Sequence, residues 1–362
     1  MSGIALDSAL IAVPVLMLAW ANGANDVCKG VATLLGSGAA SGRHALLWGA
    51  FWTVAGGLTA VFWGAALVST FSNGFLSSGF PVTTTFIVSA LGGAVAWVLL
   101  ATRLGWPVST THALLGGIVG AALVVAGPGG LRGAAIANKA LFPLLLSPLI
   151  AIVLCWCLLW LGRLVARRVP AWHPGCCEHE AWRRNPFVCQ QPGKPGTATA
   201  QRVWTALHWL SAGGTSFARG LNDVPKIAAF LLLALASGVS GQTNPQNAAF
   251  VIAMVTVVMG VGGVWGGRRV LGVLAHRVTA LDPGRSLVAN MGTSILVMLA
   301  SPLGLPVSTT HVSTGSLLGI RWADRAGPTE GDALRSILFA WLVTLPVAGG
   351  VAALTTLSIA LF

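Results

Sequence analysis

The sequence predicts an all-α integral membrane protein made of two inverted repeats of transmembrane helices. Of its 362 residues, 55% are hydrophobic and only 8% are charged, whereas soluble domains average about 25% charged residues. The mean hydropathy is +0.80, and many apolar runs approach the roughly 20 residues that a helix needs to cross a bilayer. Short motifs also recur in the same order in both halves. Lipid is therefore the expected solvent for most of the chain.

The apolar runs are expected to form helices on either side of a central segment rich in proline, glycine and charge. The N-terminal repeat (1–166) has runs near 4–24, 44–71, 81–102, 107–126 and 139–166. The C-terminal repeat (203–362) has runs near 203–218, 224–238, 247–266, 286–303, 306–320 and 334–361. Residues 167–202 are the predicted linker.

The formal charge of +12 does not indicate nucleic-acid binding, because the basic residues lie mostly between apolar runs. Positive loops favour the cytoplasmic side of a membrane. We therefore expect a cell-membrane protein with a cytoplasmic central loop and both termini outside. No lysine or arginine precedes Asp26, so a cleaved signal peptide is not expected. The densest basic group is Arg163, Arg167, Arg168, Arg183, Arg184, Lys194 and Arg202.

The central loop also carries Cys176, Cys177 and Cys189, near two histidines. This group could hold a metal ion, but it lacks the CxxC pair that is typical of zinc sites. An ordinary reduced loop is favoured, and no cofactor is expected.

Two motifs are repeated. Residues 25–27 (Asn-Asp-Val) recur at 222–224, and 107–112 (Pro-Val-Ser-Thr-Thr-His) recur at 306–311, with offsets of 197 and 199. Matched order and spacing indicate duplication. An odd number of crossings in each half would invert one repeat relative to the other, a plan common among transporters with a site at the midplane.

Asp26 and Asp223 lie in repeated, mostly apolar sequence, where a charge costs about 2.5–3.5 kcal/mol on insertion scales. Lys29 and Lys226 follow three residues later, on the same helical face. Each pair could be a structural ion pair. The duplication of an expensive polar cluster favours an ion or substrate site.

Each Pro-Val-Ser-Thr-Thr-His string is predicted to begin a helix, because proline suits the first turn and serine or threonine caps it. The apolar runs that follow are short, which suggests half-helices or re-entrant segments. Helix N-termini attract phosphate-like anions, although plain capping is the alternative. The candidate hydroxyls are those of Ser109, Thr110, Thr111, Ser308, Thr309 and Thr310. Thr83 to Thr85 are expected to cap another helix. His112 and His311 are expected to pack or to support the ligands from behind, and a role as ligands is the alternative.

These motifs, with Gly-Ala-Asn-Asp at 23–26 and Gly-Leu-Asn-Asp at 220–223, resemble the PiT family of inorganic phosphate transporters. The resemblance covers both halves outside the central loop. It implies an inverted-repeat bundle that binds an oxyanion between its halves and couples transport to sodium or protons. Carried over by position, the ligands would be the six hydroxyl residues above and two aspartates, with Asn25 and Asn222 in support.

The chain departs from the family pattern at Lys29 and Lys226, where sodium-coupled members continue with a second asparagine, and at Arg219. A fixed ammonium beside each aspartate could replace a bound sodium ion, so proton coupling is favoured, and Arg219 could be an extra anion contact. Transport of sulfate or another tetrahedral oxyanion and a channel-like anion conductor are the alternatives. An enzyme with Ser109 or Ser308 as nucleophile is disfavoured, and a homodimer is left open.

Overall fold

The computed structural model describes residues 2–168, 198–237, 245–275, 283–324 and 331–361, and within these ranges it is helical and has no strand. The first half contains α1 (Ser2–Gly36), α2 (Gly42–Trp63), α3 (Ala65–Ser72), α4 (Thr84–Leu104), α5 (Thr110–Ala126), η1 (Pro128–Gly130), α6 (Gly133–Ala135), η2 (Ile136–Leu141) and α7 (Phe142–Arg168). The second contains α9 (Ala198–Ser237), α10 (Pro245–Gly266), α11 (Arg268–Val273), α12 (Pro283–Ala300), α13 (Thr309–Asp324) and α14 (Gly331–Ala360).

Among the described residues, six helical segments are long and apolar enough to cross a membrane. They lie in α1, α2, α4, α10 and α14, and in the stretch from α6 to α7. The outer surface carries large apolar side chains, such as Phe62 (81% exposed) and Leu342 (76% exposed). The interior instead holds many of the polar groups. This distribution is that of a multi-pass membrane protein, because lipid takes the place of water around it.

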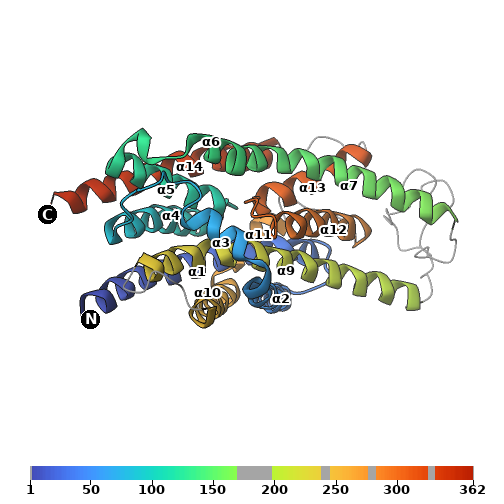
Figure 1. Ribbon diagram of the computed structural model, residues 1–362. Coiled ribbons are helices and arrows are strands. Elements are labelled where there is room, and N and C mark those ends of the chain that lie inside the picture. The colour runs from blue at the N-terminus through green and yellow to red at the C-terminus, as the bar shows by residue number, and fades with distance from the viewer. Residues whose placement is uncertain (1, 169–197, 238–244, 276–282, 325–330, 362) are drawn as a thin grey trace.

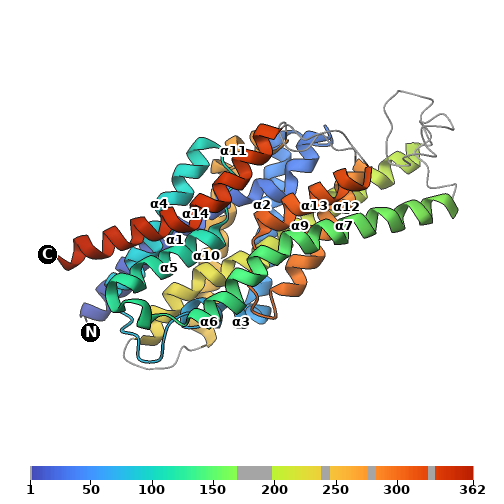
Figure 2. The same ribbon diagram turned by 90° about the horizontal axis from the view of Figure 1, so that it is seen from above.

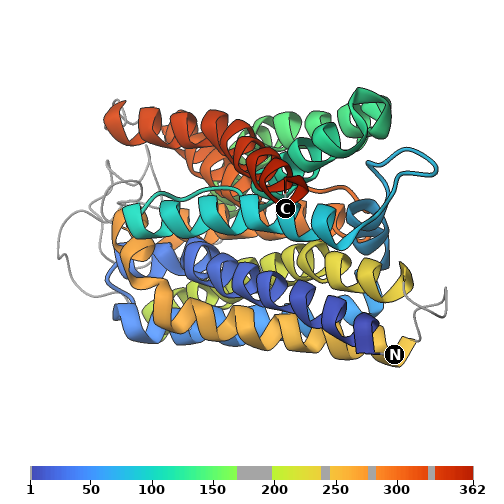
Figure 3. The same cartoon turned by 90° about the vertical axis from the view of Figure 1, so that its left-hand side faces the viewer.

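Helices α1 and α9 lie side by side while running in opposite directions (Figure 1). Helices α2 and α10 pack on this pair at one face of the molecule, and α7 and α14 lie at the opposite face (Figure 3). Both ends of the chain lie at one end of the bundle, opposite the end of α7 and the start of α9 (Figure 2). This course is the one that an inverted repeat predicts.

The halves exchange their last helices. Helix α14 packs on α4 and α5 of the first half, and α7 packs on α12 and α13 of the second. Glycines permit close approach, since a Cβ at Gly120 of α5 would lie 2.0 Å from the carbonyl oxygen of Gly349, and one at Gly319 of α13 would lie 2.3 Å from that of Ile152. Such small-residue contacts are typical of membrane helices. They hold each motif-bearing helix against the other repeat.

Three predicted boundaries were wrong. The run near 4–24 continues to Gly36, and the runs at 203–218 and 224–238 form the single helix α9, so both aspartates lie inside continuous helices. Their polar side chains have hydrogen-bond and ion-pair partners within the bundle. The free-energy cost of burying unpaired polar groups is therefore avoided, and the helices continue without a break. Conversely, the run near 44–71 is interrupted at Gly64, between α2 and α3.

The predicted helix starts are confirmed. Ser109 is the N-cap of α5, and its side chain accepts a hydrogen bond from the backbone N–H of His112. Ser308 accepts the same bond from the N–H of His311 at 3.3 Å. Thr83 caps α4 through the N–H of Phe86. Helices α5 and α13 have only 17 and 16 residues, as expected for segments that begin inside the membrane.

Candidate functional site

The predicted site residues lie together in the interior, where α1 and α9 pass the starts of α5 and α13. Every one of them is nearly inaccessible, with exposed fractions from 0% to 7%. They are Asn25, Asp26, Lys29, Ser109, Thr110, Thr111, Arg219, Asn222, Asp223, Lys226, Ser308, Thr309 and Thr310.

Each buried aspartate forms an ion pair with the lysine one turn later on its own helix. Asp26 pairs with Lys29 on α1, and Asp223 Oδ1 lies 3.2 Å from Lys226 Nζ on α9. The predicted spacing therefore does place both side chains on one helical face. In lipid, each charge would be costly without its partner.

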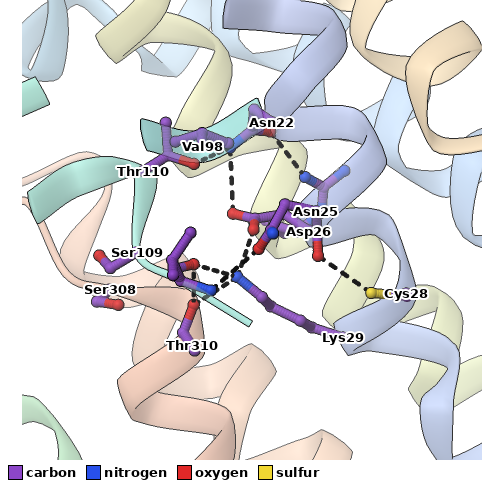
Figure 4. Close-up of polar contacts among 12 residues, drawn as sticks. Asn22, Asn25, Asp26, Cys28, Lys29, Val98, Ser109, Thr110, Ser308 and Thr310 are labelled. Atoms are coloured by element: carbon purple, nitrogen blue, oxygen red, sulfur yellow. Dashed lines mark hydrogen bonds and ion pairs between the residues drawn. The ribbon is translucent and has the colours of Figure 1, made fainter. Parts of the chain in front are cut away.

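Lys29 extends from α1 to the starts of both motif helices (Figure 4). Its ammonium donates to the carbonyl oxygen of Val108, just before α5, at 2.6 Å. It also donates to the hydroxyl of Thr310, in the first turn of α13. One lysine of the first repeat thus contacts a motif from each half.

Lys226 of the second half makes the corresponding contacts with both motif helices. Its ammonium donates to the carbonyl oxygen of Val307 at 3.1 Å and to the hydroxyl of Thr111 at 2.8 Å. The hydroxyl of Thr310 donates to Val108 at 2.9 Å, so the two helix starts also contact each other. These reciprocal contacts give the centre a pseudo-twofold arrangement.

The two carboxylates share one amide. Asn22 Nδ2 lies 3.1 Å from Asp26 Oδ2 and 3.4 Å from Asp223 Oδ2. The corresponding position of the second repeat is Arg219, whose Nη1 donates to Asn22 Oδ1 at 3.0 Å and lies 3.9 Å from Asp223 Oδ2. The two aspartates therefore lie close together, and the twofold relation is broken at this position.

Sequence reasoning missed Asn22 and Thr53. Asn22 lies one helical turn before Asp26 and 197 residues before Arg219, so the repeat offset could have identified it. Its Nδ2 also donates to Thr110 Oγ1 at 3.0 Å. Thr53 accepts from Arg219 Nη2 at 2.6 Å, and no repeated motif marks it.

The two repeated asparagines hold the extended segments that precede the motif helices. Asn25 Nδ2 donates to the carbonyl oxygen of Trp106 at 2.9 Å, and its Oδ1 accepts from the N–H of Val108 at 3.1 Å. Asn222 Nδ2 donates to the carbonyl oxygen of Val307 at 3.2 Å. Both side chains therefore position the backbone at the helix starts.

The histidines that follow the hydroxyl motifs pack against each other. The rings of His112 and His311 have centroids 4.5 Å apart, and His311 lies 3.7 Å from the ring of Trp341. His112 Nδ1 also lies 2.8 Å from Ser109 Oγ. Both histidines are thus mainly packing residues at the contact between the repeats, as expected.

The central cluster contains three cationic side chains and two carboxylates, so it has one excess positive charge when all are ionised. Hydroxyls and two helix N-termini surround it, which is a combination suited to an anion. Among the described residues, no group of three or more His, Cys, Asp or Glu could hold a metal ion. The candidate metal group at Cys176, Cys177 and Cys189 lies outside the described residues.

A sequence model described as "Phosphate transporter family" matches residues 22–352. Curated relatives include a probable low-affinity inorganic phosphate transporter of Mycobacterium leprae, 28% identical over 96% of this chain and 76% of the relative. Another of the same description, from Rhizobium meliloti, is 28% identical over 95% of this chain and 94% of the relative. The chloroplastic inorganic phosphate transporter 2-1 of Arabidopsis thaliana is 26% identical over 98% and 73%.

A solved structure titled "The sodium-dependent phosphate transporter" has the same fold. The TM-score is 0.85, with 23% sequence identity, and the match covers 99% of this chain and 100% of the other.

The ion pair on α1 leads to a stability prediction. Lys29→Met leaves Asp26 buried without its cation and should lower the free energy of unfolding by about 3–5 kcal/mol. Adding Asp26→Asn removes the unpaired charge and should recover most of that loss. Unfolding of the detergent-purified variants measures both. Arg103→Met, at an exposed position, is the control and should change stability by less than about 0.5 kcal/mol. If the double variant is no more stable than Lys29→Met, the unpaired charge of Asp26 is not the cause of the lost stability.

Proposed function

Because the chain belongs to the phosphate transporter family, we propose that it is a secondary transporter that moves inorganic phosphate across the membrane, bound between its two repeats. The observation that carries this proposal is the reciprocal arrangement of Lys29 and Lys226, each of which contacts the helix starts of both halves. One central anion would satisfy both lysines at once. Two matched half-sites suit a single shared substrate better than a catalytic centre.

The proposed ligands are the hydroxyl residues at the starts of α5 and α13 together with the lysines. Helix N-termini add partial positive charge, and hydrogen bonds to a charged ligand are stronger than neutral ones. The lysines would turn from carbonyl and hydroxyl partners toward the anion. The hydroxyls are those of Ser109, Thr110, Thr111, Ser308, Thr309 and Thr310, and Asn25 and Asn222 hold the backbone behind them.

The aspartates favour phosphate over sulfate, which is the closest rival substrate. An ionised carboxylate only accepts hydrogen bonds. Phosphate near neutral pH keeps a proton that it can donate to Asp26 or Asp223. Sulfate has no such proton, so its oxygens and the carboxylate oxygens would repel each other. Phosphate should therefore compete strongly with labelled phosphate for uptake, and sulfate weakly. Equal competition would favour a general oxyanion carrier, and single-channel currents without saturation would favour an anion conductor.

Removing two of the proposed hydroxyl ligands should weaken binding. Each hydrogen bond to a charged group is worth about 1.5–3 kcal/mol, so Ser109→Ala with Thr110→Val should raise the phosphate Kd by more than about tenfold. Equilibrium binding to purified protein measures this. Thr59→Val removes a hydroxyl that donates to the carbonyl of Ala55 on α2 and should leave the Kd unchanged. Unchanged affinity in the folded double variant would place the ligands elsewhere.

We propose that coupling uses protons and depends little on sodium, although the solved relative is titled sodium-dependent. Lys29 and Lys226 already neutralise the aspartates, and they would repel a sodium ion at the same face. Uptake by proteoliposomes should persist when potassium or choline replaces sodium at fixed pH and potential. Lys29→Asn with Lys226→Asn should strengthen sodium dependence. Loss of most wild-type uptake without sodium would contradict this coupling.

The basic residues around the linker support a cytoplasmic location for residues 167–202, with both termini outside. In a background without the six native cysteines, three of which lie in this same segment, a cysteine introduced at Lys194 should react with an impermeant thiol reagent in inside-out vesicles and not in intact cells. Labelling in intact cells would reverse the orientation.

A further inference from the structure

A cavity of about 30 Å³ lies beside Lys29, between α1, α9, α12 and α13. It is large enough for a water molecule. Seven of its eleven lining residues have polar side chains, with hydroxyls, an amide and an ammonium and no carboxylate, and the other four are alanine or leucine. These polar side chains belong to Lys29, Thr33, Thr215, Asn290, Thr293, Ser313 and Thr314.

The polar lining continues away from the centre. Asn290 Nδ2 lies 3.2 Å from both Thr33 Oγ1 and Ser211 Oγ. His208 Nε2 lies 3.1 Å from Thr33 Oγ1. Helices α12 and α13 lie toward the end of the bundle where α7 ends and α9 begins (Figures 1 and 2). Polar side chains therefore continue from the cavity beside Lys29 toward the linker end.

The other repeat is apolar at the corresponding positions. Each residue that lines the cavity has a counterpart in the other repeat, found by the offset of 197 between α1 and α9 and of 199 between the motif helices. For α4 and α12 the offset is also 199, since Thr102 and Ser301 contact Asn25 and Asn222 respectively. The counterparts of Thr33, Thr215, Asn290, Thr293 and Thr314 are Phe230, Leu18, Leu91, Ala94 and Leu115, all at most 1% exposed and all in one hydrophobic cluster. The counterpart of His208 is Ile11, in the same cluster.

The two walls differ in what they offer a moving anion. Buried polar or charged groups need hydrogen-bond partners, and hydroxyls, an amide and water can supply them. A wall of leucine, alanine and phenylalanine cannot. The centre is therefore connected to a polar route at the linker end and is closed by apolar packing at the end that holds both termini.

Given the proposed anion transport, we infer that the polar cavity beside Lys29 is the passage between the central site and the linker side of the membrane. The apolar wall closes the site to the opposite side in this conformation. Within the described part of the chain, the near twofold site thus has a polar exit on the linker side and an apolar wall on the other.

Replacing part of the polar wall with residues of the apolar wall tests this passage. Asn290→Leu with Thr314→Leu should lower phosphate uptake by proteoliposomes by about tenfold or more, the effect of one lost hydrogen bond to a charged group. Equilibrium binding of phosphate to the purified variant should stay within about twofold, because no proposed ligand of the central site changes. The control, Asn290→Ser with Thr314→Ser, keeps the wall polar and should retain most uptake. Unchanged uptake in the leucine variant, or loss of its equilibrium binding, would overturn the passage.

A second measurement needs neither phosphate nor the leucine variant. In a background without the six native cysteines, Thr314→Cys should react with an anionic methanethiosulfonate at least about tenfold faster than Leu115→Cys, since reactivity follows access to water. Equal rates would overturn the inference. If wild-type protein neither binds nor transports phosphate, the proposed function fails, and the labelling rates still decide whether the polar cavity is the hydrated side.

Discussion

The structure depends on the burial of five charged side chains in the interior of a membrane protein. An isolated charge there is expensive, and removing one partner of a buried pair leaves the other uncompensated. Four of these charges are paired within their own helices, Asp26 with Lys29 on α1 and Asp223 with Lys226 on α9. Arg219 is held by Asn22 and Thr53 from the first half. The charged centre therefore requires both repeats, and the exchanged packing of α7 and α14 keeps the repeats together.

The near symmetry of the centre and its exceptions have different consequences. The matched lysines and helix starts give the centre one arrangement that faces both halves equally. The exceptions are Arg219 opposite Asn22, which adds an excess positive charge, and the polar wall opposite an apolar one, which makes the two sides of the centre unlike. A carrier needs both properties, because its site must accept the substrate from either side while being open to only one side at a time.

Much of the centre could be predicted from the sequence because duplication marks it. The repeated Pro-Val-Ser-Thr-Thr-His strings identified the helix starts, the repeated Asn-Asp-Val strings identified the aspartates, and the three-residue spacing identified the ion pairs. The contact of Lys29 with Thr310 could not be predicted, since it joins residues 281 positions apart across two helices whose packing no local pattern fixes. The continuity of α9 was missed because a polar cluster suggests a break unless its partners are known. The polar wall was missed because single threonines and an asparagine in apolar helices resemble ordinary membrane sequence.

We propose that one tetrahedral anion binds between the starts of α5 and α13, within reach of both lysines. The most direct measurement is a structure determined with bound phosphate. The account predicts tetrahedral density between Ser109–Thr111 and Ser308–Thr310, with the ammonium groups of Lys29 and Lys226 both turned toward it. Phosphate density at another place would contradict this proposal if Lys29 still donates its hydrogen bond to Val108 and Lys226 to Val307.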